Sequence, residues 1–334
     1  MLPRTRLFRT TAAAFGIALA FSSVAACGVT DKSASESSGQ ISDLRIMVPN
    51  SPGGGYDITA RTAAKVLEDS DITSGTEVFN LEGAGGTVGL ARTVNEKGNG
   101  DLTMLMGLGV VGASYTNNSE STLSETTPIA KLIEEYGAIM VPKDSPFTTI
   151  DDLVTAWKAD PSSLSVGGGS SPGGPDHLLP MQFAQAVGVE PKDVRFVSYD
   201  GGGDLLPALL GDKIDFATSG AGEFKDQITN GDIRVLATSG EQRTEGIEAP
   251  TLKEADIDLV FTNWRGVVAP PGITDAQRQR LIDAFTSMHE TQVWKDALKA
   301  NSWADAFETG DDFGAFIEEE DKRVADTLGK LGLA

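Results

Sequence analysis

The sequence predicts an α/β fold that is divided into two domains. From Leu44 to the C-terminus, short apolar runs alternate with amphipathic segments, a pattern typical of strands and helices in layered, mostly parallel sheets. The chain has 334 residues, 40% of them hydrophobic, and a prior of about 150 residues per domain then suggests two domains with a sizeable core. Glycine-rich segments follow several of the apolar runs, so we expect tight loops at the carboxyl ends of the strands.

The elements follow from this alternation in chain order. The short apolar runs predict strands at residues 44–48, 77–81, 102–106, 138–141, 164–166, 194–198, 214–218, 235–238 and 266–269. The amphipathic segments predict helices at residues 57–68, 87–95, 150–159, 178–187, 205–210, 223–229, 275–289, 293–300 and 311–328.

The segment 48–61, Val-Pro-Asn-Ser-Pro-Gly-Gly-Gly-Tyr-Asp-Ile-Thr-Ala-Arg, is the one around which the chain is organised. It passes from an apolar run through glycines into helical apolar spacing, which predicts a strand, a tight loop and a helix. Glycines let backbone N–H groups approach a guest, and the helix start adds unpaired N–H groups, so the loop suits an anion. The alternative is a plain strand-to-helix turn.

The N-terminus predicts export. Basic residues (Arg4, Arg6 and Arg9) precede an apolar stretch at 11–23 that is too short to cross a bilayer, and small residues lead into Cys27. This resembles a bacterial lipoprotein signal, with residues 1–26 as the signal peptide and residues 27–43 as a flexible tether lipidated on Cys27. The alternative is an ordinary secretory leader. We expect the folded part to be extracytoplasmic and anchored to the membrane.

Charge and cysteine content restrict the partners. The formal net charge of −21 argues against nucleic acid and anionic membrane surfaces as partners. A single cysteine allows no intrachain disulfide.

Further glycine-rich loops follow predicted strands. They lie at residues 82–87, 107–112, 167–177 and 199–204. Because they share one end of the sheet pattern, their N–H and hydroxyl donors are expected to converge on one cleft, although each alone could be a flexible turn.

Motifs that are specific for cofactor binding, catalysis or metal binding give little support to any of these functions here. Residues 107–112 fit G-x-G-x-x-G, but the polar residues that follow, up to Ser121, do not predict a helix, so we expect no dinucleotide and no other cofactor. Neither G-x-S-x-G nor G-x-x-x-x-G-K-[ST] occurs. The only histidines, His177 and His289, lack the spacing of a zinc site, so we expect no metal. His289 is interpreted as a surface or capping residue, whereas His177 could donate a hydrogen bond to an anion.

Two acidic residues lie at predicted helix starts. Asp57 and Asp176 are expected to cap N–H groups and shape their loops rather than contact a ligand. Pro180 complicates the second case, because it would remove an early helical hydrogen bond; the helix could then begin near Leu179 and weaken the role of His177.

Together these segments carry a resemblance. Pro-Gly-Gly-Gly-Tyr-Asp-Ile-Thr-Ala-Arg, Gly-Ala-Gly-Gly, Gly-Gly-Gly-Ser-Ser with a following Asp-His, and Tyr-Asp-Gly-Gly-Gly-Asp occur in this order from Leu44 onward. They resemble the extracytoplasmic solute receptors of tripartite tricarboxylate transporters, of the TctC/Bug type, and are closer to the citrate-binding branch than to the amino-acid branches.

The resemblance implies a type II periplasmic-binding-protein fold, with a ligand between two α/β lobes. Lobe one would hold residues 44–141 plus 261–334, and lobe two residues 142–260, with hinge strands at 141–144 and 259–263. Trp264 beside the second hinge would pack either on the cleft rim or in the core.

The implied function is capture and delivery of a small carboxylate, most of all a tricarboxylate such as citrate, without catalysis. Neutral donors would hold it, because the glycine-rich loops contain no Lys and Arg61 and Arg92 lie inside helices. The implied partners are a small and a large integral membrane subunit, and the receptor is expected to be a monomer. The expected ligand-binding residues are Ser51, Gly53, Gly54, Gly55, Tyr56, Asp57, Gly85, Gly86, Thr87, Gly109, Gly169, Ser170, Ser171, His177, Tyr199, Gly201 and Gly202.

Two other classes of function stay open. An exported hydrolase would use Ser170 or Ser171 with His177 and Asp176, although adjacent Asp and His residues rarely orient on each other. A sensory lipoprotein without a transport role is the third class.

Overall fold

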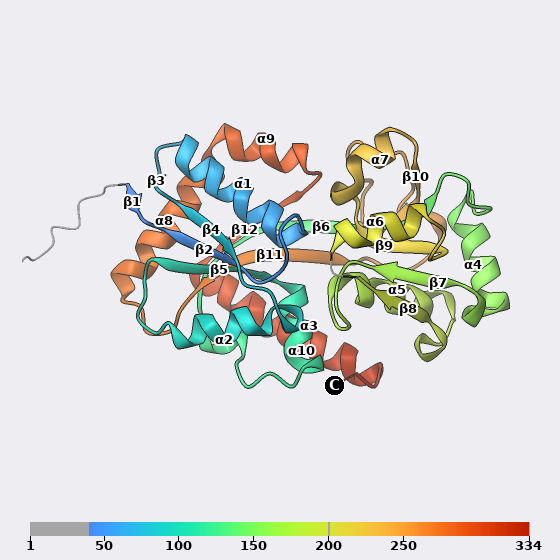
Figure 1. Cartoon of the computed structure of the whole chain (residues 1–334), viewed down its shortest axis with the longest axis horizontal. Helices are drawn as coiled ribbons and strands as arrows, with labels where there is room; N and C mark the ends of the chain where they lie inside the picture. The colour runs from blue at the N-terminus through green and yellow to red at the C-terminus, as the bar shows by residue number, and fades with distance from the viewer. Residues whose placement is uncertain (1–39, 200, 334) are drawn as a thin grey trace, which may run out of the picture. The chain divides into compact units, whose positions relative to one another are not determined.

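The computed structural model describes residues 40–199 and 201–333 (Figure 1). The predicted signal peptide, Cys27 and most of the predicted tether lie outside the described residues. Within the described part, no helix combines the length and the apolar character that a membrane span requires.

Helices and strands alternate along most of the chain. The helices are α1 (Gly55–Asp69), α2 (Thr87–Asn95), α3 (Leu108–Thr116), α4 (Ile150–Ala159), α5 (Pro175–Val187), α6 (Gly202–Leu210), α7 (Lys225–Thr229), α8 (Asp275–Glu290), α9 (Gln292–Ala300) and α10 (Gly310–Lys330). The strands are β1 (Ile41–Ser42), β2 (Arg45–Val48), β3 (Thr73–Ser74), β4 (Glu77–Asn80), β5 (Leu102–Gly107), β6 (Thr127–Pro142), β7 (Ser165–Gly168), β8 (Arg195–Ser198), β9 (Phe216–Gly220), β10 (Ile233–Thr238), β11 (Thr262–Ala269) and β12 (Ala304–Thr309).

The long strand β6 connects two parts of the sheet. Up to Tyr136 it pairs antiparallel with β11, and from Gly137 onward it pairs antiparallel with β9 and β10. Next to the first part, β4, β2 and β5 run parallel and lead through β11 to β6, with β12 on the same stretch of β6. Next to the second part, β9, β7 and β8 run parallel. Figure 1 shows β6 and β11 running between these two parts.

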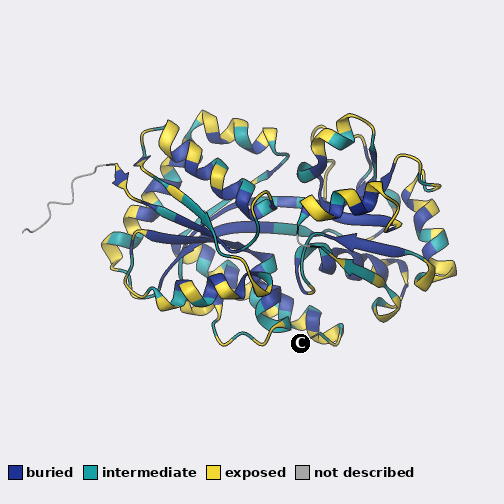
Figure 2. Ribbon diagram, in the orientation of Figure 1, coloured by how far each residue is buried: buried dark blue, intermediate teal, exposed yellow. Residues whose placement is uncertain are grey.

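Each part has its own core, although contacts group the whole segment from Gln40 onward into one unit. The first core packs around β2, β5 and β11 and contains Trp264, Trp294 and Phe313. The second part has a core on each face of its sheet, one around Trp157 and one around Leu205. Figure 2 shows the central strands buried and the outer faces of the helices exposed. Trp264 therefore packs in the core and not on the cleft rim.

Ser239 is hydrogen-bonded to both segments that connect the two parts of the sheet, at Gly137 in β6 and at Phe261 just before β11. Its hydroxyl accepts a hydrogen bond from the Gly137 N–H at 2.8 Å and donates one to the Phe261 carbonyl at 2.6 Å. Its backbone N–H donates to the Gly137 carbonyl, and its carbonyl accepts from the Phe261 N–H, at 2.8 and 2.9 Å. The segment after β10 is thus hydrogen-bonded, through one residue, to both of the segments that connect the two parts of the sheet.

Three predictions about secondary structure are wrong. The sheet is mixed rather than mostly parallel, because β6 and β11 run antiparallel to their neighbours. The strand predicted at 138–141 is only the end of β6, and β12 was not predicted. The G-x-G-x-x-G segment from Leu108 onward and the first four residues after it form a helix, α3 (Leu108–Thr116), which ends before the polar residues 117–121.

Pro180 does not shorten helix α5, which begins at Pro175 and not near Leu179. A proline at 180 cannot donate to the carbonyl of Asp176, four residues earlier. That carbonyl instead accepts a hydrogen bond from the Thr218 hydroxyl at 2.7 Å. A side chain of β9 thus replaces the missing N–H, and the helix continues.

Candidate ligand-binding site

A cavity of about 750 Å³, counting the part open to solvent, lies beside the ends of several strands. Its lining comprises Asn50, Ser51, Gly54, Gly55, Tyr56, Gly85, Gly109, Gly169, Ser170, Ser171, Gly174, Pro175, Asp176, Gly201, Glu223, Asn263 and Arg265. Residues that lie far apart in the sequence therefore meet in one place.

The structure brings many of the predicted site residues to this lining but not all of them. The lining includes Ser51, Gly54, Gly55, Tyr56, Gly85, Gly109, Gly169, Ser170, Ser171 and Gly201. It does not include Gly53, Asp57, Gly86, Thr87, His177, Tyr199 and Gly202. We call the residues of the lining that offer mainly backbone groups, namely 51, 54–55, 85, 109, 169–171 and 201, the amide loops. Within them, the Gly54 and Gly201 N–H groups already donate to the Ser51 and Gly169 carbonyls.

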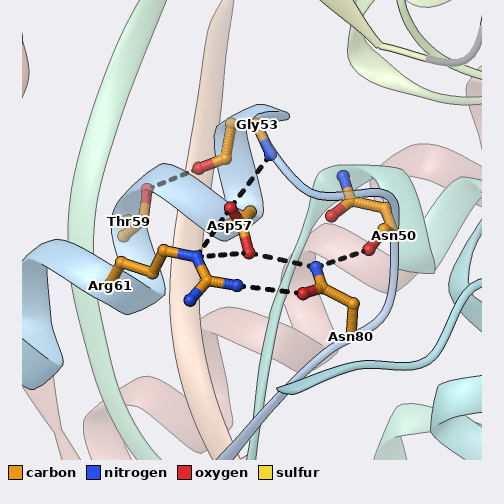
Figure 3. Close-up of polar contacts among 7 residues, drawn as sticks. Asn50, Gly53, Asp57, Thr59, Arg61 and Asn80 are labelled. Carbon is orange, nitrogen blue, oxygen red and sulfur yellow. Dashed lines mark hydrogen bonds and ion pairs between the residues drawn. The ribbon is translucent and has the colours of Figure 1, made fainter. Parts of the chain in front are cut away.

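A network of charged residues holds the loop before α1 from behind (Figure 3). The Asp57 carboxylate accepts hydrogen bonds from the Gly53 N–H at 2.9 Å and from Arg61 Nε at 2.9 and 3.0 Å. Asn80 Nδ2 donates to Asp57 Oδ1 at 3.0 Å and to the Asn50 carbonyl at 2.9 Å. Asp57 therefore shapes the loop, as predicted for a residue at a helix start.

The pKa of Asp57 reflects these contacts. Burial alone would raise the pKa, but hydrogen bonds from Arg61, Gly53 and Asn80 together hold it below its usual value. The carboxylate is thus ionised and fully engaged within the protein.

Helix α1 begins beside the cavity without a side-chain cap. Its N-cap is Gly54, and no side chain accepts a hydrogen bond from its first turn. A Cβ on Gly55 would collide with the Arg265 guanidinium, so this position leaves no space for a side chain. The uncapped amides at the helix start suit an anionic group.

Tyr56 brings a buried hydroxyl to the lining. Burial raises its pKa to about 12 against the lowering effects of Arg265 and of the Gly109 and Val110 amides. Among the described residues, none accepts a hydrogen bond from this hydroxyl.

The Ser170 loop is fixed by hydrogen bonds to its neighbours. Ser170 Oγ accepts from the Asp176 N–H at 2.9 Å, and the Ser170 carbonyl accepts from the Ser198 hydroxyl at 3.0 Å. The Gly201 N–H donates to the Gly169 carbonyl at 2.9 Å. Two adjacent loops are therefore hydrogen-bonded to each other along one edge of the cavity.

His177 is part of this loop's support and does not line the cavity. Its Nδ1 accepts a hydrogen bond from the Gly173 N–H at 3.2 Å, and its ring meets that of Phe196 edge-on, with centroids 4.8 Å apart. Burial lowers the pKa of His177 to about 4, so the ring is neutral. Within residues 40–199 and 201–333, no hydrogen bond joins His177 to Ser170 or Asp176, so the triad that a hydrolase would need is not assembled.

The expectation that the cavity holds no full positive charge is wrong. Arg265, on β11, lines the cavity with a side chain only 3% exposed, and its Nη2 lies 2.6 Å from Glu135 Oε2 and 3.6 Å from Glu223 Oε1. Burial would lower the pKa of Arg265, but Glu135 and Glu223 raise it, so the guanidinium stays charged. The predicted strand began one residue too late to include this arginine, and that error hid its place in a buried sheet.

Two carboxyl groups also line the cavity. Asp176 does not cap its helix; its side chain accepts a hydrogen bond from the Ser219 hydroxyl at 3.3 Å. Burial, followed by the charge of Glu135, raises the pKa of Asp176 to about 7 and that of Glu223 to about 8. Together with Asn50 and Asn263, Glu223 is a lining residue that the sequence did not indicate.

The described residues hold no group of three or more His, Cys, Asp or Glu side chains that could bind a metal ion.

Two α/β parts, linked by long strands and sharing a cavity, define the type II periplasmic-binding-protein fold. Residues 59–333 match the model of the tripartite tricarboxylate transporter family receptor, and the chain belongs to that family of extracytoplasmic solute-binding receptors.

Individual relatives support this assignment to the family. The chain is 27% identical over 299 residues to the "UPF0065 protein in gbd 5'region" of Cupriavidus necator, covering 87% of this chain and 88% of that protein. A TctC solute binding protein from Polaromonas is 28% identical, with a TM-score of 0.65 over 86% of this chain and 98% of that one. MatC from Rhodopseudomonas palustris, solved with bound malate, is 19% identical, with a TM-score of 0.75 over 86% of this chain and 99% of that one, and shows the shared fold.

Proposed function

We propose that this chain captures a small organic carboxylate between its lobes and delivers it to the membrane subunits of a tripartite transporter. The observation that carries the proposal is the convergence of the amide loops on one cavity of about 750 Å³. Backbone N–H groups that are held rigidly suit a carboxylate, because they donate without a change of shape. The malate bound to MatC supports an organic acid as the guest.

Capture requires no chemistry on the guest. A carboxylate would accept hydrogen bonds from the amide loops and from Arg265, and four or five such bonds, less ordering costs, would give roughly micromolar affinity. A tricarboxylate such as citrate is the guest that the family resemblance favours.

Lobe closure would complete the site. The proposed lobes are residues 44–141 plus 261–334 and residues 142–260. The change of partners along β6 at Gly137 and the bonds of Ser239 to both connecting segments support a hinge near this place. The loops of the two lobes would then meet around the guest.

Delivery would occur at the cell membrane. We propose that the receptor is a monomer anchored through a lipid on Cys27, and that its partners are a small and a large integral membrane subunit. The net charge of −21 supports neither nucleic acid nor anionic lipid as a further partner.

Isothermal titration of the refolded, ligand-stripped protein tests this function. We expect at least one of malate, succinate, adipate, glutarate, glutamate or citrate to bind saturably at roughly micromolar concentration. Small-angle scattering of the same samples should show a more compact protein when the acid is bound. A protein that binds no organic acid of this panel would contradict the proposal.

A further inference from the structure

The acidic side of the cavity, Asp176 and Glu223, is at odds with a guest that carries only carboxylates. Asp176 projects from the first turn of α5, and Glu223 lies in the short helical turn Ala221–Phe224. Both line the same cavity as the amide loops, and the Glu223 side chain is only 16% exposed. A second or third carboxylate of a guest would meet these oxygens at short range.

Arg265 does not offset these two acids. Among the described residues of the lining it is the only basic one, and its Nη2 is engaged by Glu135 at 2.6 Å, with both side chains 3% exposed. Its distance to Glu223 is longer, at 3.6 Å. One guanidinium thus lies among three carboxyl groups, Glu135, Glu223 and Asp176, and its shortest contact is already with Glu135.

Unpartnered donors indicate where a carboxylate of the guest would lie. The Tyr56 hydroxyl and Arg265 Nε are both buried donors without a hydrogen-bond acceptor among the described residues, and Tyr56 and Arg265 are 9% and 3% exposed. Buried polar atoms without partners are uncommon in folded proteins, and a ligand is one explanation for them. Both residues line the cavity, beside the uncapped start of α1.

We infer that the guest carries a protonated amine as well as a carboxylate. The carboxylate accepts from the amide loops, the Tyr56 hydroxyl and Arg265 Nε, and the ammonium donates to Asp176 and Glu223. This inference rests on the proposed function, narrows it from carboxylates in general to amino-carboxylates, and replaces citrate, the guest that the family resemblance favours, by an amine-bearing acid. The acidic side then acts as a selectivity element that disfavours guests bearing only carboxylates.

Binding of such a guest would be linked to proton release. The groups that face Asp176 and Glu223 are each other, Glu135, Arg265 and Tyr56. Because pKa values of about 7 and about 8 leave both carboxyls partly protonated near neutral pH, an ammonium would favour their ionised forms and release protons. A guest with carboxylates alone would favour the protonated forms and take protons up.

The sign of this proton exchange is the test. Wild-type protein is titrated with glutarate, L-glutamate and 4-aminobutyrate, and with succinate, L-aspartate and β-alanine, at pH 7.5 in two buffers of different ionisation enthalpy. In at least one series we expect an amine-bearing acid to bind about tenfold or more tightly than its dicarboxylate, with net proton release. Dicarboxylates that bind equally well or better, with proton uptake, would overturn the inference and leave the proposed function in place. If no acid of either series binds, and neither malate nor citrate does, both fail.

Variants locate the effect. Asp176→Asn and Glu223→Gln should each remove most of the preference for the amine and reduce the proton release, while dicarboxylate binding is kept or improved. Glu318→Gln, at an exposed position of α10, is the matched control and should retain wild-type behaviour. Thermal unfolding verifies that each variant is folded. Folded Asp176→Asn and Glu223→Gln proteins that both keep the wild-type preference would refute the assignment.

Discussion

The two sides of the cavity use charged residues in opposite ways. Beside the amide loops, Asp57 and Arg61 lie outside the lining and hold the backbone from behind. On the acidic side, Asp176 and Glu223 lie in the lining itself. Charge behind a loop determines its shape, whereas charge inside the cavity determines which guest is accepted.

The pKa values follow the same division. Asp57 accepts hydrogen bonds from several donors, and these lower its pKa despite burial. Glu223 has one cation at 3.6 Å and further carboxyls nearby, and burial raises its pKa to about 8. The direction of the shift therefore distinguishes a carboxylate that accepts several hydrogen bonds from one whose single cation does not offset its burial.

The largest effect is expected from removing the charge that the two sides share. Arg265→Met leaves Glu135, 3% exposed, without its cation, and we expect a loss of about 3 to 5 kcal/mol in the free energy of unfolding. Urea denaturation at pH 7 measures it.

The double variant Arg265→Met, Glu135→Gln is the control for that measurement. Because no isolated charge then remains buried between these two positions, we expect it to recover much of the lost stability. A single variant as stable as wild type would show that the pair does not hold this region together.

A smaller effect is expected from adding a methyl group to the amide loops. In Gly169→Ala, the new Cβ would lie 2.9 Å from the Gly201 carbonyl carbon and 3.1 Å from the Gly202 nitrogen, so the loop backbone must shift. We expect the affinity for the bound acid to fall about tenfold or more, equivalent to about 1.4 kcal/mol, in calorimetric titration.

Gly203→Ala provides the matched control. A Cβ at Gly203, inside α6, would meet no atom within 4 Å, so affinity should be unchanged and helix stability slightly increased. Equal affinities of the two variants would contradict a role for close backbone approach at Gly169.

The smallest effect is expected from Asp57→Asn, which weakens the support behind the loop. Loss of charge-assisted hydrogen bonds should cost about 1 kcal/mol of stability at pH 7 and reduce ligand affinity severalfold without removing a lining residue. The pKa of Asp57 in the folded protein lies below its ordinary value of 3.8, so its contribution is present above that pH and is lost as the pH falls through the folded pKa.

Thermal unfolding between pH 7 and pH 3 therefore measures a difference between wild type and Asp57→Asn that shrinks toward acidic pH. Asp69→Asn, which alters the exposed pair with Lys65, should change stability little at any pH. A pH-independent difference for Asp57→Asn would indicate that shape, and not charge, explains the effect.

Much of the fold could be predicted because its signals are local. The helices predicted at 87–95 and 150–159 match α2 and α4, and Thr149, the N-cap of α4, forms a capping box with Asp152 three residues on. The first half of β6 was missed because charged residues interrupt its apolar pattern. Lys131 is nevertheless buried, 2.6 Å from Glu134 and 3.8 Å from the centroid of the Phe316 ring, and Phe316 lies on a distant helix.

Helix α3 was also missed, because the local sequence does not favour a helix there. Its glycines and hydroxyl residues are weak helix formers, and Gly112 packs so closely on Gly173 that a side chain there would collide with backbone. Tertiary packing, rather than local propensity, accounts for a helix here.

The same division applies to the candidate site. The glycine-rich loops could be predicted, because each follows its own strand within a few residues. The charged groups could not, because Glu135, Glu223 and Arg265 come from separate segments that each resemble an ordinary polar surface in the sequence. Only their pairing in three dimensions shows that they are buried.

The hydrogen bond from the Thr218 hydroxyl to the Asp176 carbonyl has a consequence for the motion of the lobes. It fastens the opening turn of α5 to the middle of a sheet, at the place where a proline would otherwise leave that turn loose. If the lobes open to admit a ligand, this turn and strand β9 would move together as a rigid unit. The Asp176 side chain would then keep its orientation relative to β9 while the lobes open and close, and would not need to be repositioned when a ligand binds.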